Sequence, residues 1–235
     1  RFGAETELAE VLSVDFSGEI KKIESSEGTF KAKTIIIATG AVPRELGVPG
    51  EKELVGRGVG YCATCDGMFY RNKTVMVIGG GNTAAADAMT LSRICEKVIL
   101  VHRRDSLRAT KVYHKQLEET PNIEFYWNTT VSEFLYDKKL TGAKLHNVKT
   151  GEDTEISVDG AFISIGRKPS SELFEGILAM DEAGYIIADE STRTNIPGVF
   201  AIGDVRTKAL RQVVTAVADG AMASHYIEEY LAHQM

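Results

Sequence analysis

An α/β fold with buried parallel sheets in two domains is the class that the sequence predicts. Residues 34–38 and 74–78 form continuous apolar, mainly β-branched runs, as expected of strands that are covered on both faces. Glycine follows each run, and the second run leads through an alanine-rich helix at 84–94 to a returning strand at 97–101, which is the pattern of a βαβ unit. A connector rich in glycine and proline at 41–60 separates the two runs and predicts a domain boundary.

Short apolar runs bounded by turn residues predict further strands. Residues 1–33 alternate such runs with polar turns, as in a small antiparallel meander. Buried strands are predicted at 161–165 and 198–202, and a long helix rich in small residues at 211–231. Four strands are predicted between 121 and 160, at 123–127, 131–136, 143–148 and 155–158.

The composition predicts a globular protein with neither nucleic acid nor a membrane as its partner. The 235 residues are 43% hydrophobic and carry a formal net charge of −6, whereas nucleic acid and anionic membranes attract a basic surface. No apolar run approaches the length of a membrane span. Three cysteines in a chain of this length do not make a disulfide-stapled secreted fold, so we expect a cytoplasmic protein.

A glycine-rich turn follows the second apolar run. Gly79, Gly81 and Ala84 occupy the fixed positions of a G-x-G-x-x-A fingerprint, with Asn82 and Thr83 between them. In such a loop the glycines permit a tight turn and leave room for a pyrophosphate at the helix N-terminus. The alternative is a merely flexible glycine loop. The position between two strands about 20 residues apart favours a dinucleotide site.

Basic residues gather where the returning strand ends. His102, Arg103 and Arg104 follow this strand, and Arg108 comes four residues later. An NAD site would place an acidic side chain here for the ribose 2′-hydroxyl, whereas guanidinium groups bind a phosphate through paired hydrogen bonds. The cluster therefore predicts NADP(H). A solvated basic turn is the alternative.

The segment Cys-Ala-Thr-Cys places Cys62 and Cys65 at the spacing of a redox disulfide. Such a pair closes within one short turn, and a thiolate at a helix start is stabilised for exchange. The alternative is half of a structural zinc site, which usually needs four ligands. The only other cysteine is Cys95, and no paired histidines stand at ligand spacing, so no metal is expected.

An acidic residue follows the predicted strand at 198–202. Gly203 and Asp204 come directly after this strand. A carboxylate at such a place suits hydrogen bonds to sugar or polyol hydroxyls. An N-cap aspartate of a following helix is an equal alternative on the residue alone.

Five motifs occur in order along the chain. They are Cys-Ala-Thr-Cys-Asp-Gly (62–67), Gly-Gly-Gly-Asn-Thr-Ala (79–84), His-Arg-Arg-Asp-x-x-Arg-Ala (102–109), Phe-Ala-Ile-Gly-Asp-Val (200–205) and Arg-Gln (211–212). With these motifs the sequence resembles the bacterial-type, low-molecular-weight thioredoxin reductases over nearly its whole length. The resemblance implies two Rossmann-like, three-layer β/β/α nucleotide-binding domains. An NADPH domain at 45–171 is inserted into an FAD domain formed by 1–44 and 172–235.

The resemblance also implies roles for individual residues. Cys62 and Cys65 are the redox pair, with Cys65 next to the flavin and Cys62 attacking thioredoxin. Asp66 is the proton donor and acceptor beside them, whereas without the cysteines it would read as a turn aspartate. The implied NADPH contacts are Gly79, Gly81, Asn82, Thr83, Ala84, His102, Arg103, Arg104 and Arg108, and the implied FAD contacts are Thr39, Gly40, Gly203, Asp204, Arg211, Gln212 and Val213.

The sequence departs from the family before Thr34. The family opens with a Met-led strand and a G-x-G-x-x-G/A loop for the FAD pyrophosphate, and nothing like it precedes this residue. The missing part corresponds to roughly 70–80 residues, about one βαβ unit and two further elements. Because the first residue is Arg1, we expect a trimmed or incomplete chain, or one that cannot hold flavin tightly.

Three functions fit these features. The first is NADPH-dependent reduction of thioredoxin by a homodimer, through FAD and the Cys62–Cys65 disulfide. The second is a flavoprotein that reduces a peroxiredoxin-type partner, but such enzymes typically use NADH, and Arg103, Arg104 and Arg108 count against NADH. The third is a truncated NADPH-binding module without turnover. We expect the first, a thioredoxin-disulfide reductase.

Overall fold

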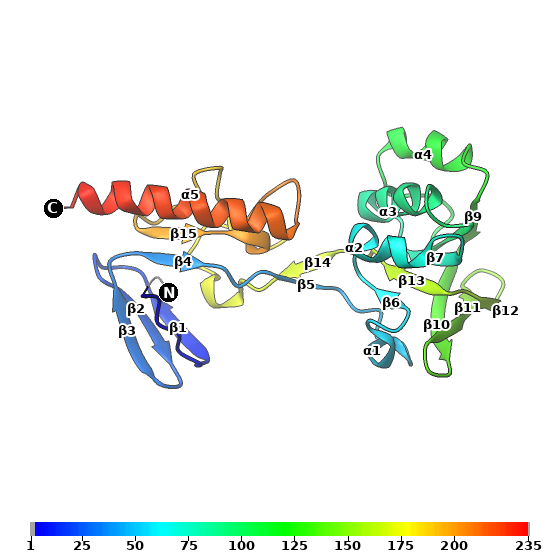
Figure 1. The fold of residues 1–235 in the computed structure, drawn as a ribbon, viewed down its shortest axis with the longest axis horizontal. Helices are drawn as coiled ribbons and strands as arrows, with labels where there is room; N and C mark the ends of the chain where they lie inside the picture. Colours follow the sequence, from blue (N-terminus) through cyan, green and yellow to red (C-terminus); the bar gives the residue numbers. More distant parts are fainter. Residues whose placement is uncertain (1–2, 235) are drawn as a thin grey trace. The chain divides into compact units, whose positions relative to one another are not determined.

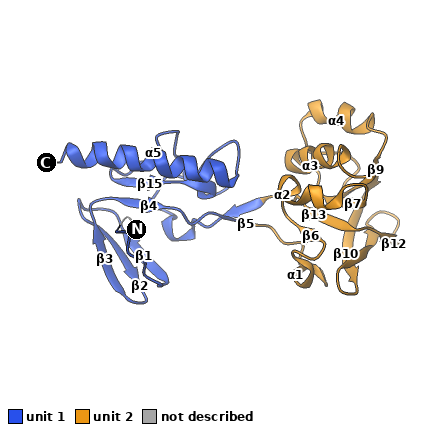
Figure 2. Cartoon of the chain, in the orientation of Figure 1, with its two compact units in different colours: residues 1–42, 167–235 blue, residues 43–166 orange. Residues whose placement is uncertain are grey.

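The computed structural model describes residues 3–234, so the expectation attached to Arg1 lies outside the described residues. The chain divides into two compact units (Figure 2). Unit 1 comprises residues 1–42 and 167–235, and unit 2 comprises residues 43–166. No helix within residues 3–234 is long and apolar enough to cross a membrane.

A five-stranded parallel sheet forms the centre of unit 2 (Figure 1). Each pair of neighbouring strands runs parallel, which requires a crossover connection rather than a hairpin. The strand before the glycine loop lies in the middle of this sheet and is therefore paired on both edges. In sheet order the strands are β6 (Val59–Gly60), β13 (Gly160–Ile163), β7 (Thr74–Ile78), β8 (Lys97–His102) and β9 (Ile123–Trp127).

The side chains of β7 alternate between two hydrophobic cores, which explains why this strand has no polar face. Val75 and Val77 belong to the core on the helical face, whereas Met76 and Ile78 belong to the core beneath an antiparallel sheet. Helices, parallel sheet and antiparallel sheet form the three layers that the family resemblance implies (Figure 1). The covering elements are α3 (Asn82–Ser92) and α4 (Lys111–Glu118) on one face and β10 (Thr129–Tyr136), β11 (Leu140–Asn147) and β12 (Asp153–Ser157) on the other.

Helix α4 of unit 2 is not predicted by the sequence pattern. It is short, with eight residues, and only Leu117 among them is buried. The glycine- and proline-rich connector also contains more structure than expected, because α1 (Glu51–Leu54) lies within it. After the connector, α2 (Ala63–Asp66) and the 3₁₀ turn η1 (Gly67–Tyr70) carry the cysteine motif.

Unit 1 contains two small sheets and a long helix (Figure 1). Its N-terminal meander has the predicted antiparallel order, and a parallel pair of strands places Ile37 opposite Ala201. Both of these residues belong to the core of the unit. The elements are β1 (Val11–Asp15), β2 (Lys21–Ser25), β3 (Gly28–Ala32), β4 (Ile35–Ile37), η2 (Glu172–Phe174), β15 (Val199–Ala201), η3 (Gly203–Val205) and α5 (Val213–Ala232), with the ladder of β5 (Ala41–Pro43) and β14 (Arg167–Pro169) where the chain passes between the units.

A buried cluster of charges ties α5 to the loop after β15. The carboxylate of Asp219 accepts hydrogen bonds from Arg206 at 2.8 and 2.9 Å and from Lys208 at 2.8 Å. The backbone N–H of Gly203 donates a further hydrogen bond of 2.8 Å. Burial raises the pKa of Asp219, but these donors outweigh it and lower the pKa to about 2. The ionised carboxylate therefore anchors the loop on the helix.

Candidate nucleotide pocket and redox disulfide

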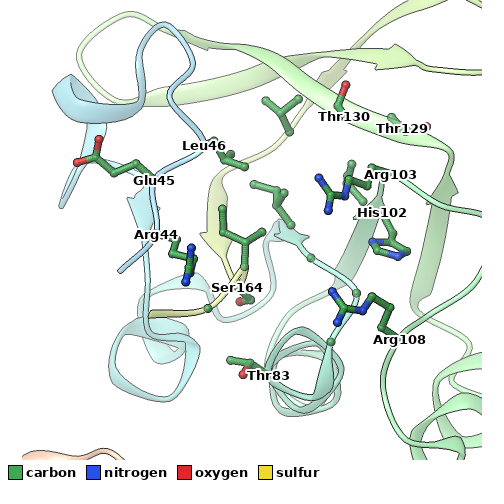
Figure 3. A pocket seen from close by; sticks show the side chains of 18 of the residues that line it. Arg44, Glu45, Leu46, Thr83, His102, Arg103, Arg108, Thr129, Thr130 and Ser164 are labelled. Atoms are coloured by element: carbon green, nitrogen blue, oxygen red, sulfur yellow. The ribbon is translucent and has the colours of Figure 1, made fainter. Parts of the chain in front are cut away.

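A cavity of about 920 Å³ lies in unit 2, at the carboxyl ends of the central strands (Figure 3). This is the edge at which parallel α/β sheets bind their ligands. The glycine loop after β7 and the basic segment after β8 both line it. Most of the remaining lining comes from 44–46, Val48, 129–131 and 164–166.

The glycines of the loop serve two different purposes. Gly79 has a φ of +149°, and a Cβ there would overlap the carbonyl oxygen of Ser164 and lie 2.9 Å from the Cβ of Ala84. Gly79 thus allows the close packing of α3 and β13 on the loop. A Cβ on Gly81 would meet nothing within 4 Å, and Gly81 is the N-cap of α3. The loop therefore offers open space at a helix N-terminus, as a pyrophosphate requires.

The loop also holds the basic segment in place. The carbonyl of Gly80 accepts hydrogen bonds from the backbone N–H groups of Arg108 at 2.7 Å and Ala109 at 3.0 Å. Asn82 Oδ1 accepts another, of 2.8 Å, from the N–H of Thr110. Thr83 lines the pocket beside them. The predicted pyrophosphate loop and the predicted arginine cluster are thus a single hydrogen-bonded structure.

His102 lies beneath the loop, where its imidazole leaves no room for a side chain at position 80. Only 6% of His102 is exposed, and its Nε2 has no partner among the described residues. Burial, together with the charges of Arg104, Arg103 and Arg108, lowers the pKa of His102. The imidazole is therefore neutral near pH 7, and its Nε2 lies against Gly80 without a hydrogen-bond partner among the described residues.

Two of the three predicted arginines face the cavity. Arg103 and Arg108 line it, whereas Arg104 does not. The carbonyl of Arg104 accepts a hydrogen bond of 3.0 Å from the N–H of Asn128, which fixes its backbone beside β9. The two guanidinium groups, the open helix N-terminus and the unpaired imidazole nitrogen fit a dinucleotide with a 2′-phosphate.

The cysteines of the motif form a disulfide, with Cα atoms 5.3 Å apart. Cys62 is the N-cap of α2, and the backbone N–H of Cys65 lies 3.2 Å from its Sγ. A donor at this position stabilises a thiolate on Cys62 once the disulfide is reduced. The third cysteine, Cys95, is free and buried, and burial raises its pKa to about 11. Within residues 3–234, no group of three or more His, Cys, Asp or Glu side chains is placed to hold a metal.

Asp66 ends α2, directly after the disulfide. A Cβ on Gly60 would lie 3.4 Å from its Oδ2, so the carboxylate lies against β6. Met68 and Phe69 follow in the next turn with 57% and 75% of their surface exposed. An exposed apolar pair beside a disulfide suits contact with another protein.

The residues of unit 1 that the resemblance assigns to FAD meet at one edge of a sheet. Thr39 and Gly40 follow β4, and Gly203 and Asp204 follow its parallel neighbour β15. Both glycines have positive φ, +72° and +70°. The hydroxyl of Thr39 donates a hydrogen bond of 2.5 Å to the carbonyl of Ser170.

The last three of these residues lead into α5. Gln212 is the N-cap of this helix and forms a capping box with Thr215. The guanidinium of Arg211 lies 3.9 Å from the ring centroid of Tyr185, and its buried Nε has no partner among the described residues. Val213 is 81% exposed. The half-buried carboxylate of Asp204 and the free Nε fit a ligand that carries both hydroxyl and phosphate groups, such as FAD.

Sequence reasoning missed three segments that line the pocket outside the glycine loop and the basic segment. Residues 44–46, 129–131 and 164–166 line the cavity without any motif of their own. The one feature in the sequence that could have indicated the segment 164–166 was Gly166, which follows the buried strand predicted at 161–165. Its significance depends on β13 being inserted between β6 and β7, which periodicity does not predict.

Comparisons with known proteins agree with this geometry. Residues 2–220 match the family model of the pyridine nucleotide-disulphide oxidoreductases. A thioredoxin reductase of Peptoclostridium acidaminophilum is 46% identical, over 98% of this chain and 75% of its own length. Among solved structures, thioredoxin reductase from Streptococcus pyogenes has a TM-score of 0.89 at 41% identity, covering 96% of this chain and 74% of that chain. Thioredoxin reductase from Giardia duodenalis has a TM-score of 0.91 at 36% identity, covering 98% and 76%.

The chain therefore belongs to the pyridine nucleotide-disulphide oxidoreductases, a class defined by a nucleotide site and a redox disulfide. Within this class it belongs to the thioredoxin reductase family, at 46% identity to a relative of which it covers three quarters. The resemblance drawn from the sequence motifs and the predicted fold class are confirmed.

Proposed function

We propose that the protein uses NADPH to reduce the disulfide of a thioredoxin, through FAD and the Cys62–Cys65 pair. One observation carries the proposal, namely that a surface disulfide and a dinucleotide pocket with two arginines are built into the same unit. FAD, when bound, would accept the hydride of NADPH and would then deliver the two electrons to the disulfide. The arginines favour NADPH over NADH and thus disfavour a reductase that uses NADH.

The NADPH site divides its work among three groups. Gly81 leaves room for the pyrophosphate at the start of α3. Arg103 and Arg108 bind the 2′-phosphate, because both line the cavity at the end of β8. His102 supports the loop from below and offers one neutral ring nitrogen to the nucleotide.

In unit 1, the edge formed by β4 and β15 holds the flavin nucleotide. Gly40 and Gly203 keep the backbone open there, and Asp204 accepts hydrogen bonds from hydroxyl groups. Arg211 donates from its free Nε. Gln212 acts mainly as the cap that fixes the start of α5.

The disulfide then carries out the exchange. Two electrons and two protons convert Cys62–Cys65 to a dithiol, and Asp66 carries a proton to and from the sulfur atoms. The Cys62 thiolate, stabilised by the N–H of Cys65, attacks the thioredoxin disulfide and releases one thiolate. Cys65 attacks the resulting mixed disulfide, which re-forms Cys62–Cys65 and releases reduced thioredoxin.

A homodimer in the cytoplasm stays part of this proposal. Val214 and Val217 of α5 are exposed and are not among the residues assigned to FAD, so they give unit 1 an apolar surface that a second copy could cover. Light scattering after size exclusion measures the mass directly. A mass of one chain at every concentration would contradict the dimer.

Replacement of either cysteine tests the proposed exchange. Cys62→Ser and Cys65→Ser should each abolish NADPH-dependent reduction of thioredoxin, because a single thiol cannot cycle through an intramolecular disulfide. Both variants should bind NADPH with unchanged affinity, since neither cysteine lines the cavity. Cys95→Ser is the matched control and should retain activity. Turnover by either pair variant would refute the redox assignment.

A further inference from the structure

Glu51 is a buried carboxylate to which the proposed reaction gives no role. Only 1% of its surface is exposed, and no lysine or arginine among residues 3–234 forms an ion pair with it. Its oxygens accept three hydrogen bonds, from the backbone N–H groups of Leu46 at 3.0 Å and Gly47 at 2.7 Å and from the hydroxyl of Tyr61 at 2.9 Å. A buried carboxyl group needs such donors, and here they come from two functional segments.

The first segment is a wall of the nucleotide pocket. Arg44, Glu45, Leu46 and Val48 line the cavity. The wall is fixed at one end by the hydrogen bond from the N–H of Arg44 to the carbonyl of Gly166, 3.0 Å long. Its middle is fixed by Glu51 through two amides. Without Glu51, those amides would lose their partner at the point where the wall turns.

The order of the strands tells which part of a dinucleotide this wall faces. The arginines follow β8 and the glycine loop follows β7, whereas residues 164–166 follow β13 on the opposite side of β7. With the 2′-phosphate at β8 and the pyrophosphate at the glycine loop, the nicotinamide half extends toward β13. Figure 3 shows Arg44, Glu45 and Leu46 across the cavity from His102, Arg103 and Arg108. The wall therefore borders the nicotinamide half.

The second segment leads into the redox disulfide. Tyr61 directly precedes Cys62 and packs against the core under the antiparallel sheet. Burial, together with its hydrogen bond to Glu51, raises the pKa of Tyr61, so its hydroxyl stays protonated and donates. Glu51 thus fixes the backbone that enters the N-cap cysteine of α2.

We propose that Glu51 is a positioning residue that couples the nicotinamide end of the pocket to the Cys62 segment. Two amide bonds hold the wall, and the Tyr61 hydroxyl holds the cysteine segment on the same carboxylate. A nucleotide that orders the wall therefore restrains Cys62 as well. The inference rests on the proposed NADPH site, and it assigns a function to a residue outside the motifs.

Two ligands separate this role from a general loss of structure. NADP⁺ fills both halves of the pocket, whereas adenosine 2′,5′-bisphosphate reaches only the arginines and the glycine loop. In Glu51→Gln the second acceptor oxygen becomes a donor that opposes an N–H group. Calorimetry of the whole chain should show a Kd about tenfold higher for NADP⁺ and changed by less than about twofold for the bisphosphate. An equal change for both ligands, or none for NADP⁺, would overturn the role at the nicotinamide end.

Tyr61→Phe tests the coupling and keeps the two amide bonds of Glu51. In a Cys65→Ser background, Cys62 is the reactive thiol, because Cys95 is buried. Saturating NADP⁺ should slow alkylation of Cys62 by iodoacetamide about threefold or more, and Tyr61→Phe should remove this effect while NADP⁺ affinity changes by less than about twofold. Protection that persists in Tyr61→Phe would be direct shielding by the nucleotide and would overturn the coupling.

The same measurements distinguish failure of the inference from failure of the proposed function. If the unchanged chain bound neither NADP⁺ nor the bisphosphate, the NADPH site itself would be wrong. Normal binding of both with no selective effect of Glu51→Gln would remove only the positioning role. Should Glu51→Gln fail to fold, the alkylation of Cys62 in Tyr61→Phe decides the coupling alone.

Discussion

Helix α3 of unit 2 has eleven residues, of which four are buried, whereas α5 of unit 1 has twenty residues, of which only two are buried. The sheet beneath the first has five strands, and the parallel sheet of unit 1 has two. In this chain α5 therefore covers a smaller sheet than α3 does, and the chain spans only about three quarters of the length of its thioredoxin reductase relatives. Val213, Val214 and Val217 of α5 remain 81%, 71% and 67% exposed.

The two helices are also held by different forces. The buried residues of α3 are Ala84, Ala85, Ala88 and Leu91, so apolar packing holds it. The buried residues of α5 are Asp219 and Ala223, and Asp219 binds two cations and one amide. Unit 2 should therefore respond most to the loss of apolar volume, and unit 1 to the loss of one carboxylate.

Asp219→Ala is expected to have the largest effect and to act on unit 1 alone. It leaves Arg206 and Lys208 buried without their counter-charge, which costs about 3–5 kcal/mol. In urea unfolding, the helical circular dichroism signal of this variant should show an additional transition at a lower urea concentration than in the unchanged protein. Trp127, the single tryptophan, lies in unit 2. Its fluorescence should therefore report an unchanged unfolding transition for unit 2.

Arg193→Ala is the matched control, because it removes an exposed ion pair with Glu229 of the same helix, and exposed pairs contribute about 0–1 kcal/mol. A Trp127 transition that moved together with the circular dichroism signal in Asp219→Ala would show that the two units unfold as one.

Leu91→Ala should have the corresponding effect on unit 2. Leu91 lies on the buried face of α3 and is fully buried, and such a truncation costs about 2–5 kcal/mol. Val217→Ala removes apolar volume from the exposed face of α5 and should change stability by no more than about 0.5 kcal/mol. Urea unfolding followed by Trp127 fluorescence and circular dichroism measures both. Similar losses in the two variants would contradict the contrast between the helices.

Arg103→Ala and Arg108→Ala should each weaken NADPH binding at least about tenfold, because a charge-assisted hydrogen bond contributes about 1.5–3 kcal/mol. NADH, which lacks the 2′-phosphate, should bind nearly as before. Arg104→Ala should have a smaller effect, since Arg104 does not line the cavity. Titration of protein fluorescence with NADPH and with NADH measures the dissociation constants of each variant. An equal loss for NADH would mean that the arginines maintain the fold.

Gly81→Ala should weaken NADPH binding about tenfold without loss of stability, because its Cβ would enter open space that a pyrophosphate would occupy. Gly79→Ala, by contrast, should destabilise unit 2, since its Cβ would overlap the backbone at Ser164. Calorimetric binding and thermal unfolding distinguish the two variants. Unchanged NADPH affinity in a folded Gly81→Ala protein would place the pyrophosphate elsewhere.

The smallest expected effect is a difference in the response of the units to acid. The pKa of His102 is lowered in the folded state. Its contribution to the free energy of unfolding is therefore fully present above the ordinary histidine pKa of about 6.5. Below that pH the contribution is lost, because the unfolded chain takes up a proton that the folded chain does not. The pKa of Asp219 is lowered to about 2, so its contribution is lost only between pH about 4 and 2.

Between pH 7 and 5, the unfolding midpoint of unit 2, reported by Trp127 fluorescence, should therefore fall. The contribution of Asp219 to the stability of unit 1 persists over this range. Trp127 is well placed to report it, because its ring centroid lies 6.3 Å from that of His102. His102→Gln should flatten this part of the curve. An unaltered pH dependence in that variant would assign the effect to another group.

Much of the candidate site follows from short segments of sequence. The strand Thr74–Ile78 has the predicted bounds, because its apolar side chains alternate between two covered faces and any polar residue would be buried. The glycine loop and the disulfide are equally local, since a tight turn and a pair of cysteines three residues apart depend on their immediate neighbours. Local chemistry thus determined the dinucleotide loop, the redox pair and, through the motifs, the family.

Only the tertiary structure decided which distant segments complete the site. Thr74 of β7 pairs with the segment before β13 some 85 positions later in the chain, through a hydrogen bond from its N–H to Asp159, and this strand order brings 164–166 to the pocket. The same packing turns Arg103 toward the cavity and Arg104 away. Glu51 acquires its role only because Leu46, Gly47 and Tyr61 fold around it. The apolar pattern of a sequence predicts which residues are buried. Which donors bind a buried carboxylate depends on the tertiary packing of segments that lie apart in the sequence.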